Sequence, residues 1–200
     1  MTTDAPEQAR YQVRFDWAAT GARAIGSDAD VIIWVDAATL PVPPVLAHLP
    51  ADGAIVTATI RDAAVVASWV VELQQRLARR IVIAIVAAGK PRRLAASADE
   101  HTRFAVEDLL ASGAVIDQLA KLGLDATSPE AAAAEGAFLH LGRAVGHLMS
   151  ASVTAQSAGA MAMATATATA AGSFRINLEL TSADVVVLRE HAETVSATPR

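Results

Sequence analysis

Three short runs of apolar, mostly β-branched residues are the feature that most restricts what this chain can fold into. They span residues 31–35, 54–60 and 81–86, and each is apolar at nearly every position rather than at alternate ones. Runs of this kind are typical of inner strands in a parallel sheet, which are buried on both faces. Residues 11–17 instead alternate apolar and polar side chains, which predicts a half-buried strand suited to the edge of the sheet.

Helical spacing of apolar residues appears between and after these runs. It predicts helices over 62–78, over 103–122, and from Ser128-Pro129 to about Met149, with a short turn or helical piece at 21–26. Loops are expected at 39–52, which holds four prolines, and at 90–102, and a last short strand at 185–188. Alternating strands and helices predict an α/β fold of three layers, α/β/α, in which helices cover both faces of a mostly parallel sheet.

The 200 residues are expected to form one domain over 1–200, with loose ends at 1–10 and 191–200. Residues 151–172 are a low-complexity stretch of Ala, Thr, Ser and Met. Because 47 of the 200 residues are alanine, this stretch fits a helix or a loop equally well.

Composition excludes several classes of function. The chain has no cysteine, which rules out disulfides, thiolate zinc sites, iron–sulfur clusters and a cysteine nucleophile. A net charge of −5, without basic residues interleaved with aromatic ones, argues against a nucleic-acid partner. The apolar stretches are too short for a membrane span and the first residues resemble no signal peptide, so we expect a cytoplasmic protein with no membrane partner. A homo-oligomer stays open.

Polar residues stand where the predicted strands end. Asp16, Asp36, the pair Arg61-Asp62 and the pair Gly89-Lys90 follow or close the four strands. In parallel sheets ligands bind beyond the carboxyl ends of the strands, where carboxylates could hold Mg²⁺ and arginine could grip a phosphate. The alternative is that these residues only mark the strand ends, as polar residues commonly do.

Glu107 and Asp108 lie near the start of the helix predicted over 103–122. Adjacent helical residues point about 100° apart, so at most one of the two is expected to face a shared site. Acids near a helix start are also ordinary partners of the helix dipole, which makes a solvated pair the alternative.

Several segments, in the same order along the chain, resemble the 2-phosphosulfolactate phosphatases, magnesium-dependent enzymes associated with coenzyme M biosynthesis. The most specific segment is Arg103-Phe-Ala-Val-Glu-Asp-Leu-Leu-Ala-Ser-Gly-Ala-Val-Ile116, and the resemblance spans residues 11–148. The other matching segments are 11–17, 31–36, 60–67, 85–89 and 128–131.

The chain also departs from that family's pattern. The turn after Asp36 reads Ala37-Ala-Thr-Leu-Pro41, and the chain is shortened between Pro44 and Gly53, so that the family's Asn-Gly turn has no counterpart. Thr59, Asp62 and Lys90 replace a cysteine, an asparagine and an acid that are common in the family.

The resemblance implies a phosphatase site for a small anionic phosphomonoester. Asp36, Glu107 and Asp108 would hold Mg²⁺; Asp36, Arg61 and Arg103 would be catalytic; and Arg61, Gly89 and Arg103 would bind the substrate. The alternative is a degenerate relative that has lost catalysis and binds an anion or another protein, because a lysine beside a metal site opposes metal binding.

Overall fold

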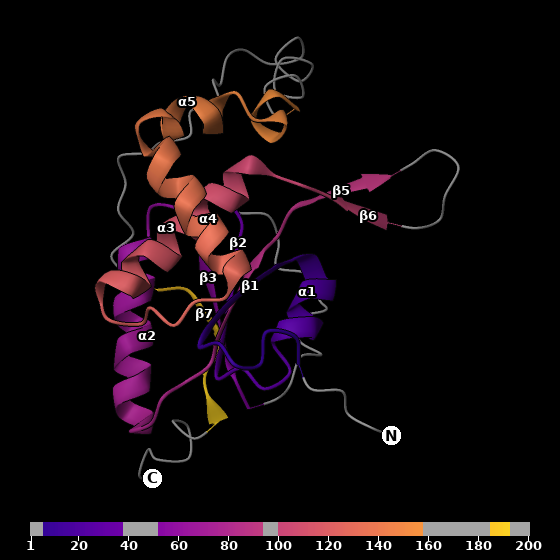
Figure 1. The fold of residues 1–200 in the computed structure, drawn as a ribbon. Coiled ribbons are helices and arrows are strands. Elements are labelled where there is room, and N and C mark those ends of the chain that lie inside the picture. Colours follow the sequence, from indigo (N-terminus) through magenta and orange to yellow (C-terminus); the bar gives the residue numbers. More distant parts are fainter. Residues whose placement is uncertain (1–5, 38–51, 94–99, 158–184, 193–200) are drawn as a thin grey trace.

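A computed structural model describes residues 6–37, 52–93, 100–157 and 185–192 of the chain. Its centre is a five-stranded sheet with the order β1-β4-β2-β3-β7 (Figure 1). The strands are β1 Val13–Trp17, β2 Val31–Val35, β3 Ala54–Ala58, β4 Ile83–Ala87 and β7 Val187–Arg189. The first four strands in this order are parallel to one another, whereas β7 runs antiparallel to β3.

Helices cover both faces of the sheet, which confirms the predicted α/β/α architecture. On one face Ile32 and Trp34 of β2 pack with α1 (Ala18–Ile25). On the other, Val31, Ile33 and Val35 pack against α2 (Ala63–Leu77), α3 (Val106–Lys121) and α4 (Pro129–Leu141). Because side chains alternate along a strand, a central strand buried on both faces has to be apolar at every position.

The inner and edge positions follow the sequence pattern. All five residues of β2 and of β4 are buried, whereas β1 lies at one edge of the sheet and becomes half-buried at Asp16 and Trp17. The outer edge of β1 pairs at Val13 with residues 126–128, and farther along it is covered by Gln8. The Gln8 side-chain amide donates to the Phe15 carbonyl at 3.0 Å and accepts from the Phe15 N–H at 3.1 Å. One glutamine side chain thus replaces one residue of a neighbouring strand.

The predicted loop at 90–102 is wrong. Residues there form an antiparallel hairpin of β5 (Lys90–Arg93) and β6 (Glu100–Arg103), which extends from the body of the molecule (Figure 1). Consequently α3 begins at Val106 and not at residue 103, so Arg103 lies on a strand. The hairpin escaped prediction because its residues are polar, with no apolar alternation to indicate a strand.

The helix predicted to run to Met149 is interrupted. After α4 the chain forms a 3₁₀ turn, η2 (Gly142–Ala144), and then the short helix α5 (Val145–Ser150). Gly142 and Gly146 lie on either side of the change, and glycine is a poor helix former. Of the low-complexity stretch, residues 153–157 are helical and residues 158–172 lie outside the described residues, as does most of the predicted 39–52 loop.

The described parts of the two terminal segments expected to be loose, 1–10 and 191–200, form hydrogen bonds with the rest of the protein. The Glu7 N–H donates to the Ala24 carbonyl at 3.0 Å, and the Ala192 N–H donates to the Asp52 carbonyl at 3.0 Å. His191 is buried, with Nε2 3.5 Å from an Asp30 carboxylate oxygen.

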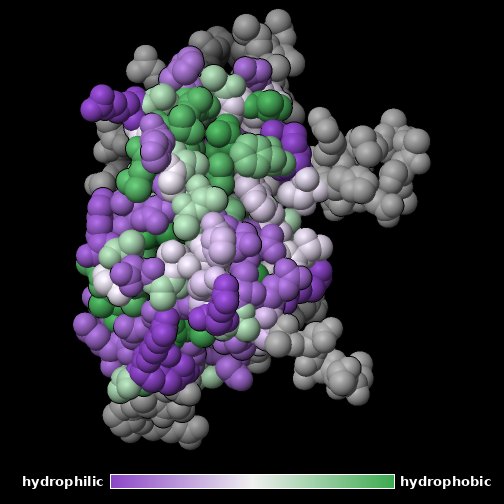
Figure 2. All heavy atoms as spheres, viewed as in Figure 1, coloured by the Kyte–Doolittle hydropathy of each residue, from purple (hydrophilic) through white to green (hydrophobic). Residues whose placement is uncertain are grey.

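Apolar side chains also reach the surface. On the face of the molecule drawn in Figure 2, apolar side chains gather where α4 and α5 lie in Figure 1, and the lower half of that face is mostly polar. Phe104, Leu139 and Val153 are each more than half exposed, at 56%, 56% and 54%. Within the described segments, none of the helices is both long enough and apolar enough to cross a membrane.

Candidate active site at the carboxyl edge of the sheet

The carboxyl ends of β2 and β4 meet because the two strands are parallel neighbours in register, with Val35 opposite Ala87. Asp36 directly follows β2, and its N–H donates to the Ala58 carbonyl at 3.2 Å. Gly89 and Lys90 follow β4, and the Ala88 N–H donates to the Val35 carbonyl at 2.8 Å. Sheet pairing therefore brings Asp36 and Lys90 together, as the strand-end argument predicted.

The Lys90 ammonium lies between two carboxylates. Its Nζ is 3.0 Å from Asp36 Oδ1 and 4.0 Å from Asp108 Oδ2. Asp108 Oδ1 accepts the N–H of Ala37, the residue after Asp36, at 2.9 Å. Lys90 and Asp36 are each 7% exposed, so these charges attract one another in a medium of lower dielectric than water.

Glu107 is buried beside this cluster without a donor. Its exposed fraction is 3%, that of Asp108 is 0%, and Glu107 Oε1, Glu107 Oε2 and Asp108 Oδ2 have no hydrogen-bond partner. The solvated-pair alternative for Glu107 and Asp108 is therefore wrong. Buried polar atoms in folded proteins are nearly always hydrogen-bonded. Carboxylate oxygens without a hydrogen bond at the carboxyl edge of the sheet therefore suggest a site for a cation or a proton donor.

Burial raises the pKa of Asp108 to about 7 from its ordinary value of 3.8. The Lys90 charge and the Ala37 N–H oppose this rise, whereas the negative charges of Asp36 and Glu107 add to it. Asp108 thus changes its protonation near neutral pH, chiefly because it is buried.

Arg61 lies at the end of the neighbouring strand β3. The turn that carries it is held by Thr59 and Asp62: Asp62 Oδ1 accepts from the Thr59 N–H at 2.5 Å and from Thr59 Oγ1 at 3.2 Å. Ile60 packs with Ala37 and Val106 around Leu110, so this turn, the residue after Asp36 and the start of α3 share one apolar cluster. Among the described residues, none accepts a hydrogen bond from the half-buried Arg61 guanidinium.

The backbone conformation at position 89 requires a glycine. Its φ is +63°, and a Cβ at this position would lie 2.4 Å from Thr102 Cγ2 and 3.1 Å from the Arg103 carbonyl. Glycine therefore permits the tight approach of β6 to the chain that carries Lys90.

Arg103 lies opposite Lys90 in the hairpin register but points elsewhere. Its Nη1 donates to the Phe104 carbonyl at 2.8 Å and its Nη2 to Thr154 Oγ1 at 3.3 Å. Asp16 does not join the cluster either: Asp16 Oδ1 accepts the Trp17 N–H at 2.7 Å, and its side chain lies against Gly21 of α1. The structure thus brings Asp36 and Asp108 to Lys90, with Glu107 buried next to Asp108 on α3 and Arg61 beyond the adjoining strand end.

The sequence analysis treats Lys90 as a polar strand-end residue and as an obstacle to metal binding, whereas the structure places its ammonium between Asp36 and Asp108. The sequence feature that singles it out is its position directly after the Ala-Gly turn that ends a buried strand, where the resembling family has an acid. Only the tertiary structure shows which carboxylates it contacts.

Carboxylate oxygens are chemically suitable ligands for Mg²⁺, since magnesium prefers hard oxygen ligands. Within the described ranges, however, no three acidic or histidine side chains form a group that could by itself hold a metal ion. Magnesium is commonly bound through one or two carboxylates together with substrate phosphate rather than by an all-protein cage. The donors therefore fit an ion that arrives with an anionic substrate.

A scan against protein-family models finds no match for this chain, and a search of curated proteins finds no similar sequence.

Proposed function

We propose that this protein is a magnesium-dependent phosphatase that hydrolyses a small 2-phospho acid, such as 2-phosphosulfolactate, to the hydroxy acid and phosphate. The observation that carries the proposal is the buried cluster of Asp36, Glu107 and Asp108 at the carboxyl edge, with unpaired carboxylate oxygens on the two α3 residues. The order of family-like segments along the sequence supports the same assignment.

One or two of the carboxylates of Asp36, Glu107 and Asp108, together with the substrate phosphate, would hold the magnesium ion. When bound, the ion would neutralise charge on a phosphoryl oxygen and lower the pKa of a bound water. The Arg61 guanidinium would grip the phosphoryl or the acid group of the substrate through parallel hydrogen bonds. Lys90 would orient Asp36 and add positive charge beside the phosphoryl oxygens.

Arg103 and Gly89 would act less directly than the resemblance implies. The donors of Arg103 are bonded to Phe104 and Thr154, so it would reach substrate only after these contacts break. Gly89 would allow the close approach of β6 and thereby place Lys90.

The experiment is phosphate release from racemic 2-phosphosulfolactate, with Mg²⁺ and then with a chelator. Wild type is compared with Asp36→Asn, with Arg61→Gln and with the control Glu72→Gln, which removes an exposed charge on α2. We expect release that needs Mg²⁺, falls at least 100-fold in Asp36→Asn and is unchanged in Glu72→Gln. No release from folded wild type, or full release by Asp36→Asn, would contradict the proposal.

A second candidate is an anion-binding module that lacks catalysis. It is favoured by the Lys90–Asp36 ion pair at 3.0 Å, which supplies positive charge where the family has an acid. Thermal melting separates the two candidates: the phosphatase predicts that Mg²⁺ and phosphate together raise Tm more than phosphate alone, whereas the anion-binding module predicts a rise with phosphate that Mg²⁺ does not change and that falls in Lys90→Met.

A further inference from the structure

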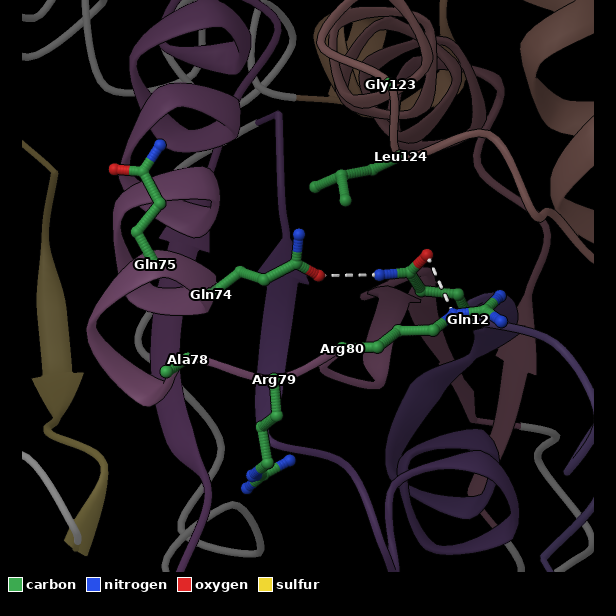
Figure 3. A pocket seen from close by; sticks show the side chains of 8 residues that line it. All are labelled: Gln12, Gln74, Gln75, Ala78, Arg79, Arg80, Gly123 and Leu124. Atoms are coloured by element: carbon green, nitrogen blue, oxygen red, sulfur yellow. Dashed lines mark hydrogen bonds between the residues drawn. The ribbon is translucent and has the colours of Figure 1, made fainter.

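A hollow of about 430 Å³ opens at the opposite, amino edge of the sheet. Gln12 and Arg80, which precede β1 and β4, line it together with Gln74 of α2 and Leu124 beyond α3 (Figure 3). A strand of five residues spans about 16 Å, so this hollow is separate from the Asp36 cluster at the carboxyl edge.

Two glutamines and an arginine form a hydrogen-bonded chain along the hollow. Gln12 Nε2 donates to Gln74 Oε1 at 2.9 Å, and Arg80 Nε donates to Gln12 Oε1 at 3.2 Å (Figure 3). Gln74 Oε1 also accepts the Ile81 N–H at 3.3 Å. Because a backbone N–H and the arginine Nε can only donate, they fix both amides with their oxygens turned inward along the chain.

The unused hydrogens along this chain belong to Gln74 Nε2 and the two Nη atoms of Arg80, because the oxygens of Gln12 and Gln74 already accept hydrogen bonds. Gln75 also lines the hollow, but its amide lies apart from this chain (Figure 3). Figure 3 shows the Gln12 and Gln74 amides facing each other below Leu124, with Arg80 reaching toward Gln12. These donors suit a ligand that presents hydrogen-bond acceptors to Arg80 and Gln74.

Arg80 also keeps its positive charge uncompensated. Its neighbour Arg79 points the other way in Figure 3 and pairs with Asp30 Oδ1 at 2.5 Å. Among the residues that the structure describes, no carboxylate pairs with Arg80. The Gln12 carbonyl oxygen holds Nε, which orients the planar fork of the guanidinium while leaving both Nη atoms available.

We propose that this hollow binds a small oxyanion, a carboxylate or a phosphate, through the Nη1 and Nη2 atoms of Arg80 and the Nε2 atom of Gln74. An Arg fork matches the two oxygens of either group. The carboxyl end of α2 adds partial negative charge beside the hollow, so we expect millimolar affinity. The site does not depend on the proposed phosphatase activity.

The test measures Tm of the full chain with inorganic phosphate and, separately, with malonate, against sodium chloride of equal ionic strength. Wild type is compared with Arg80→Met, with Arg80→Lys, which keeps the charge but loses the fork, and with Arg76→Met. Arg76 lies on the same helix end but stacks on the Trp69 ring at 5.7 Å and does not line the hollow. Arg61→Met reports on binding at the carboxyl edge.

We expect one or both anions to raise Tm by about 2–5 °C at ten times the dissociation constant in wild type and Arg76→Met, and Arg61→Met should lose only the part of the response that comes from the carboxyl edge. Arg80→Met should lose at least tenfold in affinity, and Arg80→Lys should lose part of it. A response to phosphate alone or to malonate alone identifies the preferred group. The proposal is overturned if Arg80→Met keeps the full response, if only Arg61→Met loses it, or if sodium chloride reproduces it.

Discussion

Lys90 decides what the carboxyl edge of the sheet can bind. Its ammonium lies 3.0 Å from Asp36 and 4.0 Å from Asp108, the place where a cation would otherwise balance these two carboxylates. A lysine at this position both stabilises the carboxylates and competes with a metal ion for them. The chain has one other lysine, the exposed Lys121, so the effect of removing the buried lysine can be compared with that of removing an exposed one.

Lys90→Met should destabilise the protein by about 3–5 kcal/mol at pH 8, because it leaves buried carboxylates without their partner. Magnesium should restore part of this loss, so the rise in Tm with Mg²⁺ should be larger in the variant than in wild type. Urea unfolding and thermal melting with and without Mg²⁺ measure both effects.

Lys121→Met is the matched control for this substitution. Lys121 is 61% exposed and pairs with Asp117 one helical turn away, so its loss should change stability by about 0–1 kcal/mol. Equal and small effects of the two substitutions would show that the Lys90 ion pairs do not stabilise the carboxyl edge.

Asp108→Asn should remove a pH-dependent loss from the free energy of unfolding. The pKa of Asp108 is about 7 in the folded protein against 3.8 ordinarily, so the fold favours the protonated acid. The stability of wild type should therefore fall as the pH rises from about 4 to 7, by about 4 kcal/mol in total from this group. The amide cannot ionise and still offers its oxygen to the Ala37 N–H.

The difference in unfolding free energy between Asp108→Asn and wild type should thus be small at pH 4, grow up to pH 7 and be constant above pH 8. Urea titrations at four pH values measure it, with Glu72→Gln as the control for loss of an exposed acid. A difference that does not change with pH would mean that Asp108 titrates alike in the folded and unfolded chains.

At the scale of elements, Gly113 sets how closely α3 and α4 pack. A Cβ on Gly113 would lie 2.2 Å from the Ala134 carbonyl oxygen and 2.7 Å from Phe138 Cβ. The backbones of the two helices therefore touch at this glycine, and this contact holds α4 across the same helix whose first turn carries Glu107 and Asp108.

Gly113→Ala should destabilise the protein by about 1–3 kcal/mol, because α4 must move away to admit the methyl group. Gly136→Ala, on α4, is the matched control. A Cβ there meets nothing within 4 Å, so alanine should stabilise by about 0.5–1 kcal/mol through better helix propensity. Urea unfolding measures both; the same sign of change for the two variants would contradict this account of the contact.

At the scale of the whole molecule, the two apolar clusters on either face of the sheet share the same strands. Residues 31, 33 and 35 of β2 belong to the cluster under α2, α3 and α4, while Ile32 and Trp34 belong to the cluster under α1. One cluster cannot lose its packing without disturbing the strands that support the other.

We therefore expect the chain to unfold in one cooperative step. Trp34 lies in the α1 cluster, and Trp17 and Trp69 pack against the other, so tryptophan fluorescence reports on both faces and circular dichroism on the helices. The two signals should follow one urea transition with the same midpoint. Separate midpoints would show that the two faces unfold independently.

The two edges of the sheet differ in chemistry. The carboxyl edge holds the carboxylates of Asp36 and Asp108 at the Lys90 ammonium, with Glu107 buried beside Asp108, whereas the amino edge offers the donors of Gln74 and Arg80. The proposed cation and oxyanion sites are therefore about one strand length apart, and ligands of opposite charge should bind to them independently.

The sequence by itself determined the strands of the central sheet, most of the helices and the edge of the sheet at which the acids collect. Its information was sufficient there because a strand buried on both faces must be apolar at every residue, and parallel strands necessarily end at one edge. The positions of β2, β3, β4 and α2 were predicted to within two residues, and the edge position of β1 followed from its alternation.

Only the tertiary structure decided how the polar side chains are paired. The β5–β6 hairpin lacks an apolar pattern, the bonding of Gln8 to Phe15 joins residues on a turn and a strand, and Lys90 could have faced solvent as readily as Asp36. Hydrogen bonds and ion pairs depend on distances of a few ångströms between residues far apart in the chain, such as 36, 90 and 108. Those distances are set by sheet register and helix packing, which local sequence does not encode.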